Sequence, residues 1–293
     1  MVLQIEIECR REDVEPLSAL LEESGALSQI LTDKFDNAIL EPELGTTPLW
    51  PDVIFQALFA DPEDAKAAAR QISERFPQLN PSISPLPEKD WERACLDEFK
   101  PLRFGKRLWV TPSWLTPPDT QAVNLILDPG LAFGTGTHAT TSLCLEWLEQ
   151  ADVSQKTIID YGCGSGIIAL AGLKLGARHA YAVDIDEQAL QATQYNAELN
   201  ALGSEYLTTG FPEILQNSSD ILIANILLSP LLTLKESFFQ LVNQQGMLAV
   251  SGILKDQASI LAEAYASHFQ LLTTLQKDEW VLLIFKPKQT PVE

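Results

Sequence analysis

The stretch TIIDYGCGSGIIALAGLKLG, residues 157–176, decides the fold of this chain. It begins with a short apolar run that ends at Asp160, continues with Gly162, Gly164 and Gly166 at alternate positions, and becomes an apolar helical segment. A buried strand, a glycine turn and a helix form one unit of a parallel α/β sheet. Alternating glycines let a flat or extended ligand approach the backbone closely. We therefore predict a ligand site here, with Asp160 beside it to suit a ligand that carries an ammonium group.

Two other glycine-rich sites do not fit this stretch. The dinucleotide fingerprint G-x-G-x-x-G requires glycine at position 167, where the chain has Ile167. A phosphate-binding P-loop requires a lysine directly after the glycines, and none follows here. A nicotinamide dinucleotide and a nucleotide triphosphate are therefore weaker candidates.

The pattern on both sides is an alternation of strands and helices from about Val123 onward. Strands are expected near residues 123–128, 157–161, 179–185, 205–209, 220–225 and 246–252, with helices near 141–150, 167–176, 187–200, 230–242 and 255–269. Residues 269–276 and 279–287 then form two strand-like runs separated only by a charged turn. With no helix between them they must pair as a hairpin, which adds an antiparallel strand to a parallel sheet. This ending resembles the seven-stranded Rossmann-like sheet of class I S-adenosylmethionine-dependent methyltransferases.

The amino-terminal part of the chain has a different pattern. Residues 1–88 alternate strands and helices in an order that predicts a small α+β domain of ferredoxin-like type, with strands that include Ser28–Leu31 and Ala38–Leu40. Residues 89–118 are basic and rich in tryptophan, and we interpret them as a helix, a short strand and a linker. The expected organisation is therefore a recognition domain at 1–88, a linker segment at 89–118 and a methyltransferase domain at 119–293.

Two polar side chains end neighbouring strands of the predicted sheet. Asp184 ends the strand after the glycine turn, about twenty residues on, where a carboxylate can accept hydrogen bonds from both ribose hydroxyls of a nucleoside. Asp186 is expected to cap the following helix instead. Asn225 ends the strand expected near residues 220–225, beside the expected methyl-donor site, and is our candidate catalytic residue.

Composition excludes several other classes of function. The 293 residues carry 40 acidic and 20 basic side chains, a net charge of −20, so direct binding to nucleic acid is not expected. The four cysteines lie far apart, and the three histidines lack metal-ligand spacing, so no metal site is expected. Neither a signal peptide nor a membrane span is recognisable, which favours a cytoplasmic protein, and we expect a monomer.

Four motifs together resemble the PrmA-type methyltransferases. They are DPGLAFGTGTHATTSLCLEWL from residue 128, DYGCGSGIIALAGLKLGA from residue 160, DIDEQALQAT from residue 184 and ANILLSPL from residue 224. The family modifies ribosomal protein L11 of the large subunit. The resemblance implies S-adenosylmethionine as cofactor and, as substrate, the α-amino group and lysine ε-amino groups of this basic ribosomal protein. It also implies the cofactor contacts Thr141, Gly162, Asp184 and Asn225, with Phe133, Gly134 and Thr137 in a loop that closes over the donor.

Two alternatives remain at this point. The chain could be a methyltransferase for another protein or a small amine, or a non-enzymatic module that binds S-adenosylmethionine. No dedicated general base is evident, because His138 is the only histidine in a motif and is expected mainly to lead the loop into the following helix.

Overall fold

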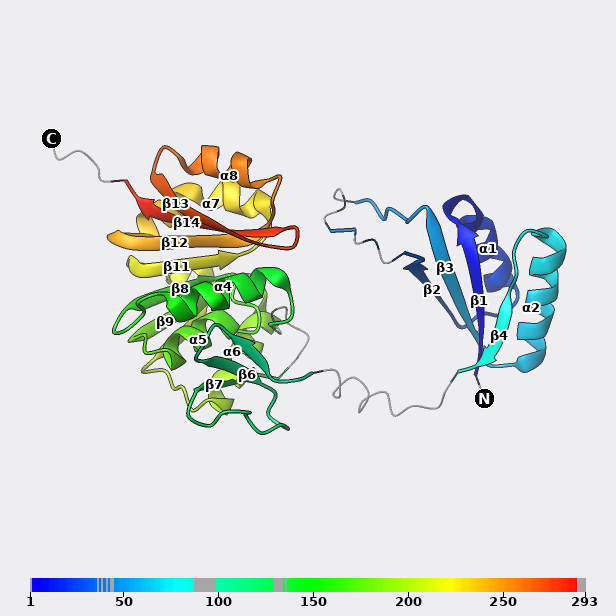
Figure 1. Ribbon diagram of the computed structural model, residues 1–293, viewed down its shortest axis with the longest axis horizontal. Helices are drawn as coiled ribbons and strands as arrows, with labels where there is room; N and C mark the ends of the chain where they lie inside the picture. Colours follow the sequence, from blue (N-terminus) through cyan, green and yellow to red (C-terminus); the bar gives the residue numbers. More distant parts are fainter. Residues whose placement is uncertain are drawn as a thin grey trace. The chain divides into compact units, whose positions relative to one another are not determined.

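The computed structural model describes residues 2–35, 37, 39–40, 42, 45–86, 99–128, 134 and 136–288. The chain divides into two compact units, Met1–Ala94 and Cys95–Glu293 (Figure 1). Each unit has its own hydrophobic core and is described by itself.

The described part of unit 1 is a four-stranded antiparallel sheet with two helices. Its elements are β1 (Leu3–Arg10), α1 (Arg11–Glu23), β2 (Ser28–Asp33), β3 (Asp52–Phe59), α2 (Pro62–Arg75) and β4 (Ser82–Pro85). The strands lie in the order β2-β3-β1-β4, and every neighbouring pair is antiparallel. This order confirms the predicted ferredoxin-like arrangement.

Local sequence explains where the helices of unit 1 begin and end. Asp61 caps α2 by accepting a hydrogen bond from the Glu63 backbone N–H at 2.8 Å, and Pro62 occupies the first turn. Gly25, with φ of +87°, follows the end of α1, where the left-handed backbone favours glycine. The strand predicted at Ala38–Leu40 is wrong in its described part, since Ile39 and Leu40 lie outside any strand and Ala38 lies outside the described residues.

Unit 2 contains a seven-stranded sheet of the predicted kind. Its strands are β8 (Thr157–Tyr161), β9 (His179–Val183), β10 (Leu207–Gly210), β11 (Ser219–Asn225), β12 (Val242–Leu254), β13 (Phe269–Lys277) and β14 (Trp280–Pro287). They lie in the order β10-β9-β8-β11-β12-β14-β13. Only β14 is antiparallel to its two neighbours, which confirms the terminal hairpin.

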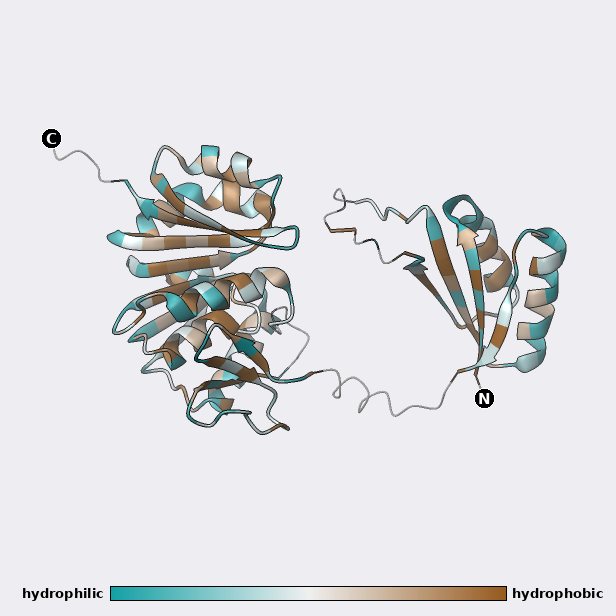
Figure 2. Ribbon diagram, in the orientation of Figure 1, coloured by the Kyte–Doolittle hydropathy of each residue, from teal (hydrophilic) through white to brown (hydrophobic). Residues whose placement is uncertain are grey.

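Helices cover both faces of this sheet. The helices in the described part of unit 2 are α4 (Ala139–Gln150), α5 (Ile167–Lys174), α6 (Glu187–Leu199), α7 (Leu228–Leu241) and α8 (Ala258–Tyr265), with a short 3₁₀ turn η1 (Pro212–Ile214). Alternate strand residues enter opposite cores: Ile158 packs in the core with α4 and α5, whereas Ile159 packs with α7 and α8. Strands buried on both faces therefore have nearly continuous apolar sequences, which Figure 2 shows as brown along β11 and β12.

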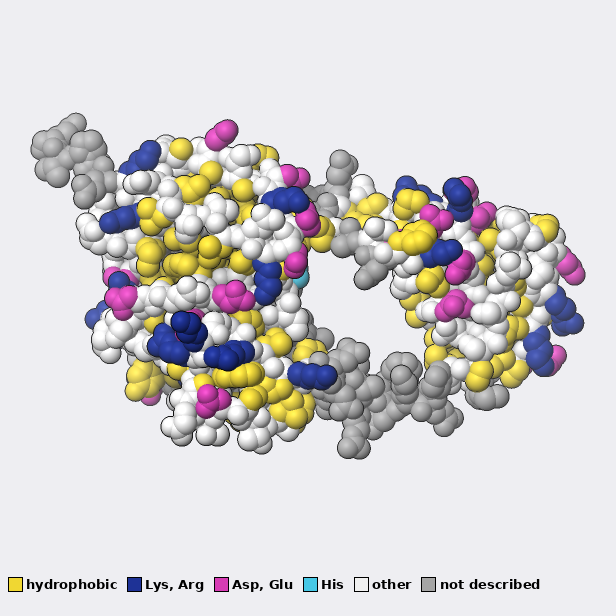
Figure 3. All heavy atoms as spheres, in the orientation of Figure 1, with side chains coloured by type: hydrophobic (Ala, Val, Ile, Leu, Met, Phe, Trp, Pro, Cys, Tyr) yellow, Lys and Arg dark blue, Asp and Glu magenta, His cyan; other side chains and the backbone are white. Residues whose placement is uncertain are grey.

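A separate three-stranded sheet precedes the main sheet. It consists of β5 (Leu102–Phe104), β6 (Leu108–Thr111) and β7 (Val123–Ile126), in the order β5-β6-β7. Phe104, Leu108 and Val110 are buried in the same core as α4 and α5. The described part of the segment interpreted as a linker thus packs within unit 2, and the strand predicted from residue 123 joins this small sheet. Figure 3 shows Lys and Arg side chains gathered near this three-stranded sheet and α5.

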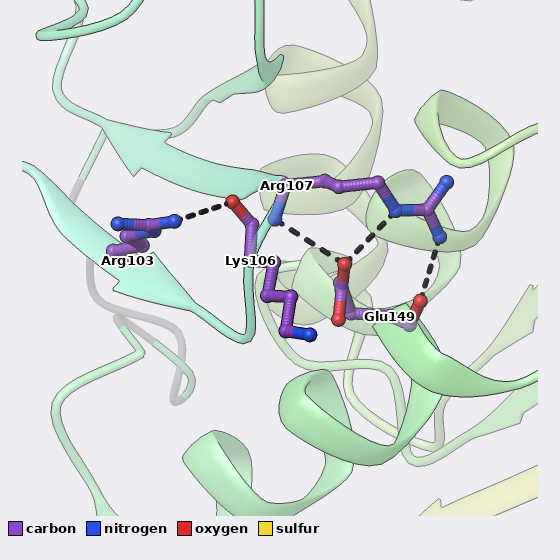
Figure 4. Close-up of polar contacts among 4 residues, drawn as sticks. All are labelled: Arg103, Lys106, Arg107 and Glu149. Carbon is purple, nitrogen blue, oxygen red and sulfur yellow. Dashed lines mark hydrogen bonds and ion pairs between the residues drawn. The ribbon is translucent and has the colours of Figure 1, made fainter.

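A buried carboxylate ties the β5–β6 hairpin to α4. The Glu149 side chain is 5% exposed, and its Oε1 accepts hydrogen bonds from the Arg107 backbone N–H at 3.2 Å and from Arg107 Nε at 2.9 Å (Figure 4). Arg107 Nη2 also donates to the Glu149 carbonyl at 2.7 Å. Gly105 makes the approach possible, because a Cβ there would lie 2.2 Å from Glu149 Oε2.

We expect Glu149→Ala to lower the free energy of unfolding by about 1–3 kcal/mol, because it leaves the Arg107 backbone N–H and Nε without their shared acceptor. Glu63→Ala removes an exposed ion pair to Lys66 and should change stability by less than about 0.5 kcal/mol. Urea denaturation of both variants measures the difference between their free energies of unfolding. Equal losses in the two variants would contradict it.

Candidate active site

The site lies where the strand order of the seven-stranded sheet reverses. From β8 the chain proceeds outward to β9 and β10 on one side, whereas β11 and β12 lie on the other side. The helices that follow β8 and β11 leave a crevice at the carboxyl ends of these strands, where open α/β sheets bind their ligands. The glycine turn after β8, Asp184 after β9 and Asn225 at the end of β11 all meet at this edge.

The glycine turn needs glycine for two physical reasons. Gly162, Gly164 and Gly166 have φ of 80°, 53° and 80°, in the left-handed region that favours glycine. A Cβ on Gly162 would lie 2.4 Å from the Ile226 side chain, and one on Gly166 would lie 2.7 Å from Thr193. The backbone of the turn is therefore both bent and closely packed.

Asp184 is held by the glycine turn that it follows. Its Oδ2 accepts a hydrogen bond from the Gly164 N–H at 3.0 Å, and its Oδ1 accepts one from the Asp186 N–H at 3.1 Å. Asp186 in turn caps α6 by accepting from the Gln188 N–H at 2.9 Å, which confirms its predicted role. Asp184 is half-buried and borders the cavity described below.

The loop before α4 is tied to the same turn. The Gly134 carbonyl accepts a hydrogen bond from Ser165 Oγ at 2.6 Å, and a Cβ on Gly134 would lie 2.9 Å from that oxygen. His138 caps α4, since its Nδ1 accepts from the Thr140 N–H at 3.3 Å. The predicted role of His138 in leading the loop into the helix is confirmed.

Asn225 and Thr141 join the two sides of the site. Thr141 lies in the first turn of α4 and is fully buried, and its Oγ1 accepts a hydrogen bond from Asn225 Nδ2 at 3.3 Å. The amide of Asn225 is therefore oriented, and among the described residues its Oδ1 accepts no hydrogen bond. A free carbonyl oxygen at this edge is an acceptor for a ligand N–H.

Asp160 lies beneath the turn with no exposed surface. One carboxylate oxygen accepts from the Ala169 N–H at 3.0 Å, while the other, Oδ1, has no partner among the described residues. Burial, and to a smaller extent the charge of Asp184, raise the pKa of Asp160 to about 7. A cationic group bound above the turn would favour its charged form.

The raised pKa makes the stability of this unit depend on pH. Between the ordinary carboxyl pKa near 4 and about 7, the folded state holds a proton that the unfolded state has lost. The free energy of unfolding of the wild type should therefore fall as pH rises from 5 to 7.5, by up to about 1.4 kcal/mol per pH unit relative to Asp160→Asn. Urea unfolding of both proteins across this range tests it, and parallel pH profiles would contradict the assignment.

One cavity of about 650 Å³ collects most of the predicted site residues. The predicted residues that line it are Gly134, Thr141, Gly162, Gly164, Asp184 and Asn225. Asp160 lies behind the glycine turn rather than in the wall, and Thr137 is not among the lining residues. Phe133 lies outside the described residues.

Comparisons with known proteins agree with this geometry. The sequence profile of the family described as "Ribosomal protein L11 methyltransferase (PrmA)" matches residues 1–288. The chain belongs to this family. A ribosomal protein L11 methyltransferase of Legionella pneumophila strain Philadelphia 1 is 58% identical over 289 residues, covering 98% of this chain and 100% of that protein. One of Nitrosococcus oceani is 48% identical, over 96% and 97% of the two chains.

A solved structure shows the same relationship. The crystal structure of a ribosomal protein L11 methylase from Lactobacillus delbrueckii subsp. bulgaricus matches 65% of this chain and 100% of that chain, with a TM-score of 0.60 and 32% identity. The predicted methyltransferase fold and the predicted family are both confirmed.

The chemistry of the site fits S-adenosylmethionine, the methyl donor expected in this methyltransferase family. The donor carries positive charge, and Asp160 offers a buried carboxylate oxygen that has no partner among the described residues. The nucleoside of the donor would meet the Asp184 carboxylate beside a glycine turn that a Cβ at Gly162 or Gly166 would crowd.

Two residues that line the cavity were not predicted from the sequence. Ile185, which is 83% exposed, and Pro212 of η1 line the cavity next to Asp184 and provide apolar surface for a purine ring. Both residues lie within two positions of the end of a parallel strand or its last polar residue. That position at the carboxyl edge of the sheet could have identified them.

The part of the chain that the structure describes contains neither a metal-ligand cluster nor a membrane-spanning helix. In that part of the chain, no three or more His, Cys, Asp or Glu side chains cluster as a metal site would require. Nor do the described helices include one with the length and apolar character needed to cross a membrane.

Proposed function

We propose that this chain transfers methyl groups from S-adenosylmethionine to the α-amino and lysine ε-amino groups of ribosomal protein L11. One observation carries the proposal: a glycine turn, the Asp184 carboxylate and an oriented asparagine amide, from three separate strand ends, line a single cavity. The names of the relatives supply the substrate, since they are ribosomal protein L11 methyltransferases.

Each residue has a defined role towards the donor. Asp184 accepts hydrogen bonds from the ribose hydroxyls, while Gly162 and Gly164 let the methionine portion lie against the backbone. Asp160 balances positive charge from below the turn. Gly134 and Thr141 form the wall contributed by the loop and α4. Contacts from Phe133 and Thr137 to the donor are what the family resemblance implies.

The reaction is an in-line displacement at a methyl carbon. S-adenosylmethionine, when bound, supplies a methyl group on a positively charged sulfur that leaves as a neutral thioether. The amine nitrogen forms the new bond with its lone pair as the carbon–sulfur bond breaks, and the nitrogen then loses a proton to water. Asn225 Oδ1 accepts an N–H of the amine and aims its lone pair, so much of the rate comes from alignment.

The amine must be neutral to react. A free α-amine titrates near pH 8 and a lysine near 10.4, so the lysine requires more help in losing its proton. Removal of the amine from water as it enters the site favours its neutral form by desolvation. His138 is not the base in this proposal, because its Nδ1 already accepts the Thr140 N–H of the helix cap.

Unit 1 is assigned to substrate recognition, with residues 1–88 as the recognition domain. It is strongly acidic, which suits a basic ribosomal protein by electrostatic steering. The same charge disfavours direct binding to nucleic acid. The proposal further takes the protein to act as a monomer in the cytoplasm, which light scattering and cell fractionation can test.

A labelled-donor assay tests the function. The purified chain is incubated with radiolabelled S-adenosylmethionine and ribosomal proteins from a strain that lacks the enzyme, with the Asp184→Ala protein as the inactive control. We expect label on L11, and peptide mass spectrometry then locates the methylated amines. Cofactor binding without label on any large-subunit protein would instead indicate a non-enzymatic binding module, and label on a different protein would indicate another substrate.

A further inference from the structure

Helix α6 buries a stripe of polar side chains, Thr193, Asn196 and Asn200. Their spacing of three and four residues places them on one face of the helix, with Asn200 at its C-cap. They are 0%, 2% and 8% exposed. A buried polar group needs a hydrogen-bond partner, whereas an apolar side chain in its place would need none. The partners of these three residues therefore show what the stripe holds in place.

The two ends of the stripe bond the backbone of two segments outside the helix. Thr193 Oγ1 donates to the Gly164 carbonyl at 3.0 Å, in the glycine turn. Asn200 bonds both backbone groups of Ile126, the last residue of β7: its Oδ1 accepts from the N–H at 2.9 Å, and its Nδ2 donates to the carbonyl at 2.6 Å. One end thus holds the glycine turn, and the other holds β7.

Asn196 lies between these two residues and bonds both segments at once. Its Nδ2 donates to the Ser165 carbonyl of the glycine turn at 3.0 Å, and its Oδ1 accepts from the Asp128 N–H at 3.3 Å, just after β7. The hydroxyl of Ser165 donates in turn to the Gly134 carbonyl, and Gly134 lines the cofactor cavity. Asn196 itself does not line that cavity. Any effect of Asn196 on the donor must therefore pass through the backbone that it holds.

The first turn of the same helix is tied to the carboxylate at the cavity. Asp186 caps α6 by accepting from the Gln188 N–H, and its own N–H donates to Asp184 Oδ1 at 3.1 Å. Asp184 Oδ2 accepts from the Gly164 N–H, while the Gly164 carbonyl accepts from Thr193. One helix thus fixes both backbone groups of Gly164, directly on one side and through Asp184 on the other.

We propose that Asn196, with Thr193 beside it, is a positioning residue for the methyl donor, whose amide holds the glycine turn and the segment at Asp128 at the spacing that the donor requires. The inference rests on the proposed function, because it concerns the site of the same donor. Neither residue touches the donor in this assignment. Each acts by fixing backbone groups of the turn.

Two asparagine variants on the same helix test the proposal. Asn196→Ala removes the link between the turn and Asp128, whereas Asn200→Ala removes a similarly buried amide that bonds β7 and α6 but not the turn. Both should lose similar amounts of stability in urea, since each leaves buried backbone groups without a partner. Calorimetry with S-adenosylhomocysteine should give an affinity about tenfold or more below the wild type for Asn196→Ala, and within about threefold of it for Asn200→Ala.

A kinetic measurement adds a readout that a purely structural role would not move. With L11 as substrate, Asn196→Ala should raise KM for S-adenosylmethionine about tenfold and keep kcat within about threefold at saturating donor. The reason is that Asn225 is oriented by Thr141 and not by α6.

The threonine supplies a milder pair of variants, which decides the question if Asn196→Ala does not fold. Thr193→Val keeps the shape and removes the hydroxyl that donates to the Gly164 carbonyl, so its affinity for S-adenosylhomocysteine should fall about three- to tenfold. Thr193→Ser keeps the hydroxyl and should bind more tightly than Thr193→Val. Equal affinities of these two variants would overturn the proposal.

Failure of the positioning role is distinguishable from failure of the function. If the wild type binds S-adenosylhomocysteine, but Asn196→Ala and Asn200→Ala bind it equally, the stripe is only structural and the proposal is overturned, while the function stands. If the wild type binds neither S-adenosylmethionine nor S-adenosylhomocysteine, the proposed function itself fails. If the wild type binds both and methylates nothing, the function fails, and a weaker affinity of Asn196→Ala alone would still support the positioning role.

Discussion

Asp184→Ala is expected to weaken binding of S-adenosylmethionine about 100-fold or more. The carboxylate accepts hydrogen bonds from the Gly164 and Asp186 N–H groups and borders the cavity. Hydrogen bonds to a charged group contribute about 1.5–3 kcal/mol each, and the ribose supplies two hydroxyl donors. The substitution removes both and frees the Gly164 N–H as well. Isothermal titration calorimetry with S-adenosylmethionine measures the loss directly.

Two controls separate the ribose contact from the fold. Asp184→Asn keeps a carbonyl oxygen for the Gly164 N–H and loses the charge, so its affinity should fall between those of the wild type and the alanine variant. Asp186→Ala removes the cap of α6 and should lower stability by about 1 kcal/mol, with affinity unchanged within a few-fold. Wild-type affinity in Asp184→Ala would refute the ribose assignment.

Asn225→Ala is expected to lower kcat about 100- to 1000-fold, while affinity for the donor changes by less than about tenfold. The asparagine amide is oriented by Thr141. Its carbonyl oxygen is the hydrogen-bond acceptor where the cofactor cavity meets the smaller cavity that Asn225 also lines. Losing that acceptor leaves the amine unaligned, and misplacement of a reacting group typically costs about two orders of magnitude. Single-turnover methylation of L11 with saturating donor isolates the chemical step.

Variants of Thr141 test the orientation of the amide. Thr141→Val has nearly the same shape but lacks the hydroxyl that accepts from Asn225 Nδ2, so it should show an intermediate loss of kcat. Thr141→Ser keeps the hydroxyl and should lose less. Asn225→Ala with a kcat within threefold of the wild type would remove Asn225 from the mechanism.

The cofactor half of the site was predictable because its signals are local. A strand, alternating glycines and a helix occupy one continuous stretch, and the need for positive φ at Gly162 and Gly166 can be inferred from residue type. Asp184 and Asn225 were found in the same way, since each ends a strand and parallel strands present their carboxyl ends at one edge. Asp160 belongs to the same motif, but its burial beneath the turn was not evident from it.

The small sheet is a part of the fold that the local sequence did not reveal. Residues 102–111 contain alternating apolar residues and basic residues, with prolines nearby, which is also typical of a connecting segment. What commits β5 and β6 to unit 2 is the burial of Phe104 and Leu108, together with the hydrogen bonds from Arg107 to Glu149. These partners lie in distant parts of the chain, and no local pattern identifies them.

The sequence by itself determined the order of strands and helices, the antiparallel hairpin at the end of the sheet and most of the predicted residues that line the larger cavity. Periodicity and residue type encode these features within a few turns of chain. Only the tertiary structure decided that His138 and Trp280, far apart in the sequence, stand side by side next to Asn225. A cavity between elements exists because packed side chains leave it open, and that packing is a property of the whole fold rather than of any one segment.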